Sequence, residues 1–240
     1  MKPTALVTGG NSGIGFATAK YFKENGYDVT ISGRDENRLV QAAQRLGVAY
    51  AVADMSCVKQ ITSFTTWFQD KPLNVLVNNA GIYNLSPLGE ICVEDIAKSL
   101  NTNIRGPMLL TKNLLPALKN AKGCVVNISS AIVENGVPNS SLYATTKGAI
   151  EAFTRNLALE LAPEGIRVNA VSPGSINTSL FNKFDIPMSD IATIREHIRS
   201  TIPLQRHGSP YEVAEVVYAM AISHYVTGSI WTVDGGISAC

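Results

Sequence analysis

The pair Tyr143 and Lys147, with Ser130 upstream of it, offers the clearest chemistry in this sequence. Side chains four residues apart lie on one face of a helix, with Cβ atoms about 5 to 6 Å apart, so the ammonium can lie near the phenol. A free tyrosine titrates near pH ~10, and a nearby cation favours its phenolate; a shift of ~3 units corresponds to roughly 4 kcal/mol. We therefore expect Tyr143 to exchange a proton near neutral pH. Taken alone, the pattern also fits a surface Tyr and Lys on an ordinary helix.

A glycine-rich turn near the amino terminus follows a strand-like run and opens a helical one. Glycines let the backbone approach a pyrophosphate, and a helix amino terminus supplies free N–H donors and a positive dipole. Its glycine spacing does not follow the common G-x-G-x-x-G fingerprint. The residues expected to contact a dinucleotide here are Gly9, Asn11, Ser12, Gly13, Ile14 and Gly15.

The end of the second expected strand indicates which dinucleotide binds. NAD is read there by an acidic residue that holds the ribose hydroxyls. This chain has Gly33, which leaves room, and Arg34, which can pair with a 2′-phosphate. We therefore predict NADP(H), with NAD(H) possible because Asp35 follows directly and Arg34 also fits a solvated residue at a strand end.

Two later turns extend the expected nucleotide site. Asp54 follows the third strand and could accept a hydrogen bond from the adenine amino group, or cap a helix beginning near Ser56. Asn79, Ala80 and Gly81 close the fourth strand. Their small size suits a backbone passing beside the adenosine ribose, although they also fit a bare turn.

The elements that must position these residues alternate along the chain. The expected strands are 4–8, 28–32, 49–53, 75–78, 124–129, 167–171 and 229–233. The expected helices are 14–25, 36–46, 61–69, 93–119, 141–161 and 210–222. This order predicts an α/β fold: a doubly wound Rossmann-type parallel sheet of about seven strands with helices on both faces. Such sheets bind ligands beyond the carboxyl ends of their strands.

Length and composition narrow the class of protein. The 240 residues contain no Pro/Gly/Ser-rich linker, so we expect one domain over 1–240. Lys and Arg number 20 against 19 Asp and Glu, without a basic cluster, which argues against nucleic acid as a partner. We expect no signal peptide, no membrane span and a cytoplasmic location. The four cysteines and three histidines lack ligand-like spacing, so we expect no metal and no disulfide framework.

The expected helix 141–161 is apolar almost all round, which is typical of a helix buried on two sides. One side can face the sheet, and the other needs a second helix or a second subunit. We therefore expect a homo-oligomer, a tetramer or a dimer; the alternative is a helix covered by its own chain.

Taken together, these motifs resemble the short-chain dehydrogenase/reductase family, in the subgroup typified by the bacterial 3-oxoacyl carrier-protein reductases. The resemblance spans about residues 4–236. The matching motifs are T-G-x-x-x-G-I-G at 8–15, N-N-A-G at 78–81, Asn103 within 102–106, Ser130 within 127–130, Y-x-x-x-K at 143–147, S-P-G at 172–174 and V-D-G-G at 233–236.

The resemblance implies roles for four residues. Tyr143 would be the general acid in carbonyl reduction and the base in alcohol oxidation, and Lys147 would tune it and hold the nicotinamide ribose. Ser130 would donate a hydrogen bond to the substrate oxygen. Asn103 would anchor a water that links Lys147 to solvent.

The resemblance also implies that residues 169–178 cradle the nicotinamide. Pro173 and Gly174 turn the chain, Ile176 would bond the carboxamide through its backbone, and Thr178 would contact the amide or the diphosphate. Ser12 departs from the family pattern, because many NADP-preferring relatives carry a basic residue there. Arg34 is then the single expected reader of the 2′-phosphate.

The substrate side is expected in the segments 130–139 and 180–206, with a loop or lid at about 176–206. The apolar residues of the second segment are Phe181, Phe184, Ile186, Pro187 and Met188. A short helix over 190–201, capped by Ser189, would follow. These side chains favour a small apolar or acyl-chain ketone, although loop packing explains them as well.

The sequence therefore predicts an NADP(H)-dependent oxidoreductase that interconverts a ketone or 3-oxoacyl group and a secondary alcohol. One alternative is an NAD-dependent alcohol or sugar dehydrogenase on the same fold. A second is a non-catalytic NADP(H)-sensing protein, which would need none of the proton-transfer residues. An epimerase or dehydratase of the longer relatives would need an extra substrate domain, for which the chain has no length.

Overall fold

The computed structural model describes residues 2–68, 71–178 and 188–239. Within them, seven strands form one sheet in the order β3-β2-β1-β4-β5-β6-β7, and every neighbouring pair is parallel. The strands are β1 Thr4–Thr8, β2 Asp28–Gly33, β3 Ala49–Val52, β4 Val75–Asn78, β5 Cys124–Ile128, β6 Arg167–Pro173 and β7 Ile230–Val233. Strand order reverses between β1 and β4, the position where a doubly wound sheet opens a ligand crevice.

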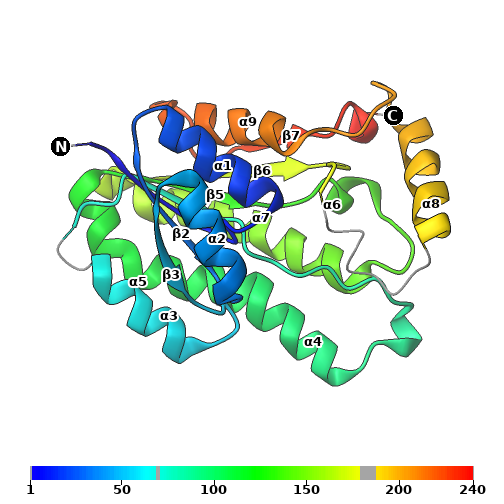
Figure 1. The fold of residues 1–240 in the computed structure, drawn as a ribbon, viewed down its shortest axis with the longest axis horizontal. Helices are drawn as coiled ribbons and strands as arrows, with labels where there is room; N and C mark the ends of the chain where they lie inside the picture. The colour runs from blue at the N-terminus through cyan, green and yellow to red at the C-terminus, as the bar shows by residue number, and fades with distance from the viewer. Residues whose placement is uncertain (1, 69–70, 179–187, 240) are drawn as a thin grey trace.

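Helices cover both faces of this sheet (Figure 1). The helices are α1 Gly13–Glu24, α2 Glu36–Leu46, α3 Val58–Thr65, α4 Val93–Leu100, α5 Gly106–Ala121, α6 Ile132–Asn135, α7 Ser141–Leu161, α8 Met188–Thr201 and α9 Pro210–Ile222. One buried cluster joins the sheet to α1, α2 and α9, and a second joins it to α3, α5 and α7. The expected single-domain, doubly wound α/β fold is thereby confirmed.

The expected helix 93–119 is wrong in one respect, because a π-helical turn at Asn101–Arg105 separates α4 from α5. The Gly106 N–H bonds the Asn101 carbonyl, five residues back. Pro107 has no N–H and cannot donate to the carbonyl of Asn103, four residues before it. The sequence Gly106-Pro107 therefore interrupts the regular α-helical hydrogen bonds in the turn that carries Asn103.

Helices α3 and α8 also begin earlier in the chain than expected. Helix α3 begins at Val58 and ends at Thr65, where a 3₁₀ turn, Thr66–Phe68, continues it. Helix α8 extends over Met188–Thr201, so Ser189 lies within its bounds and not before its first residue. The expected apolar residues Phe181, Phe184, Ile186 and Pro187 lie outside the described residues.

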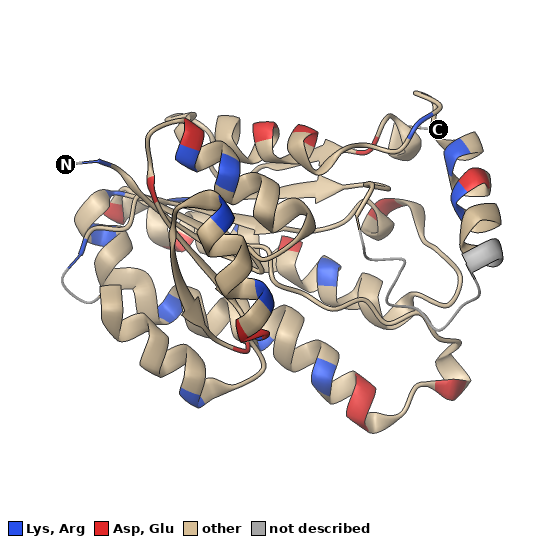
Figure 2. Cartoon of the chain, in the orientation of Figure 1, with Lys and Arg blue, Asp and Glu red and all other residues tan. Residues whose placement is uncertain are grey.

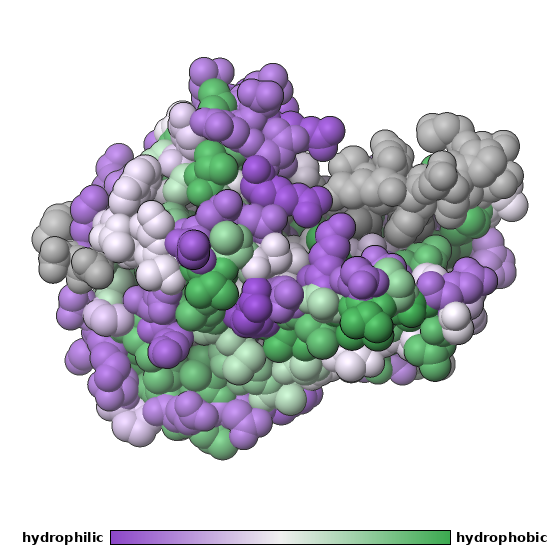
Figure 3. Space-filling view, turned by 90° about the horizontal axis from the view of Figure 1, so that it is seen from below, coloured by the Kyte–Doolittle hydropathy of each residue, from purple (hydrophilic) through white to green (hydrophobic). Residues whose placement is uncertain are grey.

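Helix α7 is covered on one side by its own chain, but its opposite side is open. Ile150, Ala158 and Leu161 are buried, whereas Ala152 is exposed and Leu159 is 78% exposed. Helices α4 and α5 also expose apolar side chains, those of Val93, Ile96, Leu100 and Met108. Figure 3 views the molecule from below, the side of α3, α4 and α5, and shows apolar residues running across this face.

Charges of both signs are interspersed over the described surface, without a block of one sign (Figure 2). None of the helices in the described part of the chain combines the length and apolar character needed to cross a bilayer. Cys57, Cys92 and Cys124 are free thiols.

Candidate active site

The glycine-rich turn places three glycines where side chains do not fit. Gly9 and Gly13 have φ of +65° and +54°, in the left-handed region that favours glycine. A Cβ on Gly15 would lie 2.3 Å from the Gly9 carbonyl oxygen. Ser12 is the N-cap of α1, and its side chain makes no cap hydrogen bond within the described structure. The first N–H groups of α1 have no intrahelical acceptor, so this turn fits a pyrophosphate.

Asn79 holds the turn against the end of β4. Its Nδ2 donates to the carbonyl oxygens of Thr8, at 2.8 Å, and Gly9, at 3.4 Å. The Thr8 hydroxyl accepts from the backbone N–H groups of Asn79 and Ala80, both at 2.9 Å. From the sequence we expected only a backbone beside the adenosine ribose at this turn. The supporting role of the Asn79 side chain was not anticipated.

The segment 173–178 comes from the far side of the site and reaches the same turn. Gly174 is held by its N–H bond to the Val233 carbonyl, and a Cβ on it would lie 2.5 Å from Asp234 Cβ. A Cβ on Gly13 would lie 3.3 Å from Thr178 Cγ2, so Thr178 lies directly beside the glycine-rich turn. Ile176, which lies between Gly174 and Thr178 in the chain, is buried. The structure therefore joins two expected parts of a dinucleotide site that are far apart in the chain.

Arg34 is exposed at the end of β2, and the neighbouring Asp35 is already engaged. The Asp35 carboxylate accepts from the Arg38 N–H at 3.1 Å as the N-cap of α2, and lies 3.3 Å from the Arg38 guanidinium. Asn11 lies over Gly33, whose added Cβ would meet Asn11 Oδ1 at 3.1 Å. Asp35 therefore works as a helix cap, and Arg34 is the basic group beside the turn at this strand end.

Asp54 forms a local turn. Its Oδ1 accepts from both the N–H and the hydroxyl of Ser56, each at 2.7 Å, and its N–H donates to Gln60. Because α3 begins at Val58 with Cys57 at its N-cap, the alternative in which Asp54 caps this helix is wrong. Its Oδ2 is the oxygen still suited to an adenine amino group.

Tyr143, Lys147 and Ser130 meet beyond the carboxyl end of β5. Lys147 Nζ lies 5.6 Å from the centre of the Tyr143 ring and donates to the Ile128 carbonyl at 2.7 Å. Ser130 lies near enough to the Tyr143 phenol to act on its pKa, in the direction that lowers it. The strand end thus supplies the serine and the carbonyl, and α7 supplies the tyrosine and the lysine from one face.

Burial decides the protonation of this pair, and it corrects the expected neutral titration of Tyr143. Although the tyrosine is partly exposed as a whole, protein surrounds its phenol, and this burial raises its pKa despite the opposing effect of Ser130. Lys147 is 6% exposed, and burial lowers its pKa to about 8. In the protein by itself the phenol is therefore a protonated acid beside an easily neutralised amine.

Asn103 lies buried beside the lysine and is held by its own side chain. Its Oδ1 accepts from the Ile82 N–H, and its Nδ2 donates to the Ile82 carbonyl, both at 2.8 Å, and to Thr146 Oγ1 at 3.0 Å. A Cβ on Gly81 would lie 3.3 Å from Asn103 Oδ1 and 3.7 Å from Lys147 Nζ. The amide and the ammonium therefore face the same small space above Gly81, as a relay to solvent requires.

Two neighbours of the pair were missed by the sequence reasoning. Tyr83 packs edge-on against Tyr143, with ring centres 4.5 Å apart, and its hydroxyl lies 2.7 Å from Ser140 Oγ. Glu151, four residues after Lys147 and 4% exposed, accepts from the Ser129 hydroxyl at 2.9 Å. The helical spacing from Lys147 is the signal that could have found Glu151.

A hollow of about 670 Å³ lies elsewhere, along β3 beside Tyr50 and Trp67. Strands β2, β1 and β4 lie between β3 and β5, the strand beyond whose end Tyr143 lies. The candidate site is therefore identified by its reactive side chains and not by this hollow. Within the described residues, no group of three or more His, Cys, Asp and Glu is arranged to hold a metal ion.

Comparison with known proteins places this arrangement among oxidoreductases. The family model described as enoyl-(acyl carrier protein) reductase matches residues 9–238. The 3-oxoacyl-(acyl-carrier-protein) reductase of Mus musculus is 35% identical, over 99% of this chain and 98% of its own. FabG of Thermotoga maritima, of the same description, is 35% identical over 97% and 96%. The uncharacterized oxidoreductase YmfI of Bacillus subtilis is 32% identical over 98% and 99%.

Solved structures agree with these relatives. The actinorhodin polyketide ketoreductase with NADPH superposes with a TM-score of 0.91 at 30% identity, covering 100% of this chain and 98% of that one. ElxO with NADPH bound has a TM-score of 0.90 at 32% identity, covering 100% of both chains. A short chain dehydrogenase/reductase family protein has a TM-score of 0.89 at 34% identity, covering 99% and 98%.

Proposed function

Because the chain belongs to the short-chain dehydrogenase/reductase family, and is thus an oxidoreductase of CH–OH donors with NAD(P), we propose that it interconverts a ketone and a secondary alcohol with NADP(H). A 3-oxoacyl group is the proposed form of the ketone, since relatives named for that reduction are 35% identical over nearly their whole length. The observation that carries the proposal is the meeting of Ser130, Tyr143, Lys147 and Asn103 at one strand end.

The nucleotide fits the residues present. The turn at Gly9, Gly13 and Gly15, where positive φ or close contacts exclude side chains, together with the open N–H groups of α1, would hold the diphosphate. Arg34 would pair with a 2′-phosphate, which favours NADP(H) over NAD(H). Thr178 would contact the diphosphate from the opposite side. When bound, NADPH supplies the hydride of the reaction.

The remaining proposed nucleotide contacts come from three turns. Ser12, Asn11 and Ile14 lie at the start of α1, and Asp54, Asn79, Ala80 and Gly81 lie at the ends of β3 and β4. Pro173, Gly174 and Ile176 shape the segment that would receive the nicotinamide.

The proton transfer belongs to this chain. As hydride reaches the carbonyl carbon, negative charge develops on the carbonyl oxygen, and the Ser130 hydroxyl stabilises it by donating a hydrogen bond. The Tyr143 phenol gives its proton to that oxygen. Its raised pKa keeps the phenol protonated and ready at neutral pH. Lys147 then stabilises the phenolate and returns a proton to it from solvent, through the space that it shares with Asn103 above Gly81.

The test is NADPH oxidation with a panel of ketones and 3-oxoacyl thioesters, run beside Tyr143→Phe. We expect turnover by the wild type and a kcat/KM lower by roughly 10²- to 10⁴-fold in the variant, the usual contribution of a general acid. NADPH affinity should stay within about twofold, because the phenyl ring keeps the packing against Tyr83. Tyr225→Phe, at a fully exposed tyrosine, is the control. Turnover that survives in Tyr143→Phe would refute the assigned acid.

We further propose that the enzyme is a cytoplasmic homo-oligomer. The free thiols of Cys57, Cys92 and Cys124 support a reducing compartment. The open apolar side of α7, where Leu159 is 78% exposed, and the exposed apolar residues of α4 and α5 support association of two copies.

A further inference from the structure

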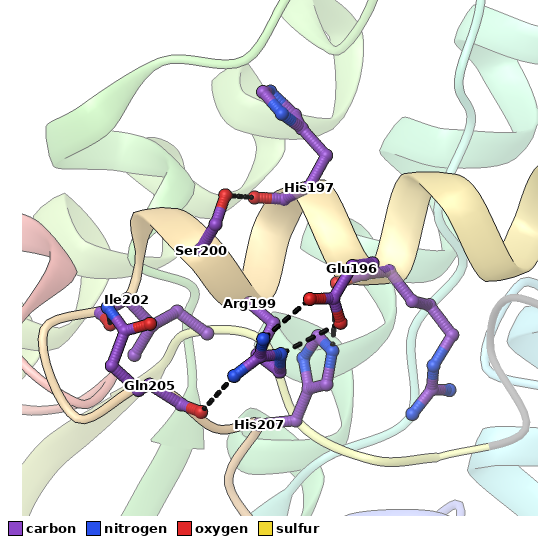
Figure 4. A network of polar contacts seen from close by, with 8 residues as sticks. Glu196, His197, Arg199, Ser200, Ile202, Gln205 and His207 are labelled. Atoms are coloured by element: carbon purple, nitrogen blue, oxygen red, sulfur yellow. Dashed lines mark hydrogen bonds and ion pairs between the residues drawn. The ribbon is translucent and has the colours of Figure 1, made fainter.

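His207 lies between two segments that surround the proposed nicotinamide site. The segment 173–178 approaches it from one side and helix α8 from the other (Figure 4). The ring Nδ1 lies 2.9 Å from Ser175 Oγ, and Nε2 lies 3.1 Å from the Arg195 carbonyl oxygen. One side chain thus touches both elements through opposite nitrogen atoms.

The partners fix which nitrogen carries the proton. A carbonyl oxygen can only accept, so Nε2 must donate to Arg195. In the neutral ring Nδ1 is then the acceptor, and the Ser175 hydroxyl donates to it. Both contacts are satisfied at once by the neutral Nε2–H form.

Backbone hydrogen bonds beside the His207–Ser175 contact join the same two segments of the chain. The Gly208 N–H donates to the Ser175 carbonyl at 3.0 Å, and the Asn177 N–H donates to the Gly208 carbonyl at 2.8 Å. The Arg195 guanidinium donates to Asn177 Oδ1 at 2.9 Å. Residues 175–177 are therefore joined to 207–208 directly and to α8 through Arg195.

We propose that His207 is a positioning residue that fastens helix α8 to the segment 173–178 and so holds the nicotinamide-binding backbone in place. The inference rests on the proposed function for the identity of the bound group. His207 touches no reacting atom in this role; it acts through Ser175 and the backbone of Ile176.

The charges around the ring add a pH dependence. From α8, the ring faces Arg195, Arg199 and Glu196, and Arg199 is bound to Glu196 and to the Gln205 carbonyl. On the α9 side, Arg206 is paired with Glu212. Burial, followed by the Arg195 charge, lowers the pKa of His207 below 6.5. The His207 contacts are therefore complete above pH ~6.5, the ordinary value, and weaken as falling pH protonates the ring beside Arg195.

Three variants separate hydrogen bonding from packing. His207→Phe keeps a flat ring and loses both hydrogen bonds, whereas His207→Gln retains one donor and one acceptor on a group that does not titrate. His197→Phe is the matched control, because His197 is exposed on α8 and its ring points away from the network (Figure 4). Should His207→Phe fail to fold, Ser175→Ala removes only the donor to Nδ1.

The first measurement is hydrogen–deuterium exchange without nucleotide. We expect His207→Phe to speed exchange at the Asn177 and Gly208 amides by about tenfold, the size expected for losing two hydrogen bonds. His207→Gln and His197→Phe should exchange like the wild type. Equal exchange in His207→Phe and the wild type would overturn the inference, whether or not the protein binds NADPH.

The second measurement is the Kd for NADP⁺ at pH 8.0 and pH 5.5. At pH 8.0, His207→Phe should bind about tenfold more weakly, and His207→Gln within about twofold of the wild type. At pH 5.5, the wild type should lose affinity relative to His207→Gln. A Gln variant as weak as the Phe variant would show that the ring only packs. Wild-type protein that binds neither NADP⁺ nor NAD⁺ would overturn the proposed function, and the exchange experiment would still decide the role of His207.

Discussion

Burial opposes charge on both Tyr143 and Lys147, and in the proposed mechanism this would favour donation of the phenol proton. The phenol keeps its proton through the neutral range because its pKa is raised, whereas the pKa of Lys147 is lowered to about 8. An enzyme with this pair holds a ready acid for reduction. Oxidation needs the phenolate, which the positive charge of an oxidised nicotinamide and of Lys147 must stabilise.

This arrangement predicts the pH profile of carbonyl reduction. We expect kcat/KM to be flat from pH ~6 to ~8 and to fall above that, because Lys147 then loses the charge that stabilises the phenolate. In Lys147→Arg the fall should move to higher pH, since a guanidinium stays charged up to pH ~12. The check is a pH series of kcat/KM for both proteins at saturating NADPH. A fall at the same pH in both would exclude Lys147 as its source.

Arg34 and Arg38 form a natural pair for testing the cofactor preference. Both are exposed, but the Arg38 guanidinium lies 3.3 Å from the Asp35 carboxylate. We expect Arg34→Ala to raise the KM for NADPH by about 10- to 100-fold, the equivalent of one lost charge-assisted bond, and to leave the KM for NADH within about twofold. Arg38→Ala should change neither by more than about threefold. An unchanged NADPH/NADH ratio in Arg34→Ala would mean that another group reads the phosphate.

At the scale of elements, the break between α4 and α5 aims the residues that the site needs. The π-helical turn carries Asn103 to the backbone of Ile82 and to Thr146 on α7, so three elements meet at one amide. Helix α5 begins immediately afterwards at Gly106, packed so closely that a Cβ there would lie 2.4 Å from the Met55 carbonyl oxygen. The position of the turn therefore depends on a residue without a side chain.

Two glycine substitutions test this packing by opposite effects on stability. Gly106→Ala should lower the free energy of unfolding by about 1–3 kcal/mol, because the backbone of Met55 must move. Gly148→Ala, in α7, should raise it by about 0.5–1 kcal/mol, since the nearest atom to the added Cβ is Val133 Cγ1 at 3.9 Å. Urea unfolding of both variants provides the values. A stable Gly106→Ala protein would show that the contact between α5 and Met55 yields easily.

At the scale of the molecule, the exposed apolar side of α7 is the observation on which the proposed association of two copies rests. Helix α7 positions Tyr143 and Lys147 on its buried side, and it presents Leu159 to solvent on the other. Association through that side would brace the helix that carries the proton-transfer residues. Oligomerisation and activity should therefore be linked.

A charge on this face should separate the copies. Leu159→Lys should reduce the molecular mass measured by light scattering, because an ammonium would have to be desolvated within the contact. Tyr50→Lys, at an exposed residue of the edge strand β3, is the control and should keep the wild-type mass. If Leu159→Lys has the wild-type mass, or if the wild type is already a monomer, the proposed interface is wrong.

The sequence by itself determined the features that depend on short spacing. The periodicity of apolar residues and the positions of turn residues predicted the strand–helix alternation. They also predicted helices 36–46, 141–161 and 210–222 with their observed bounds. The four-residue spacing predicted that Tyr143 and Lys147 share one helical face. Glycines at 9, 13 and 15 predicted a turn that excludes side chains. Each follows from local steric and helical geometry, which a few neighbouring residues suffice to set.

Only the tertiary structure decided the features that depend on what surrounds a residue. Burial reversed the expected shift of the Tyr143 pKa, since desolvation depends on neighbours from other elements. In the structure, Asp35 caps helix α2, and the Asn79 side chain hydrogen-bonds the glycine-rich turn. His207 hydrogen-bonds Ser175, which is far away in the chain. Spacing along a sequence fixes direction on one element, whereas solvation and hydrogen-bond partners are fixed by the elements that pack against it.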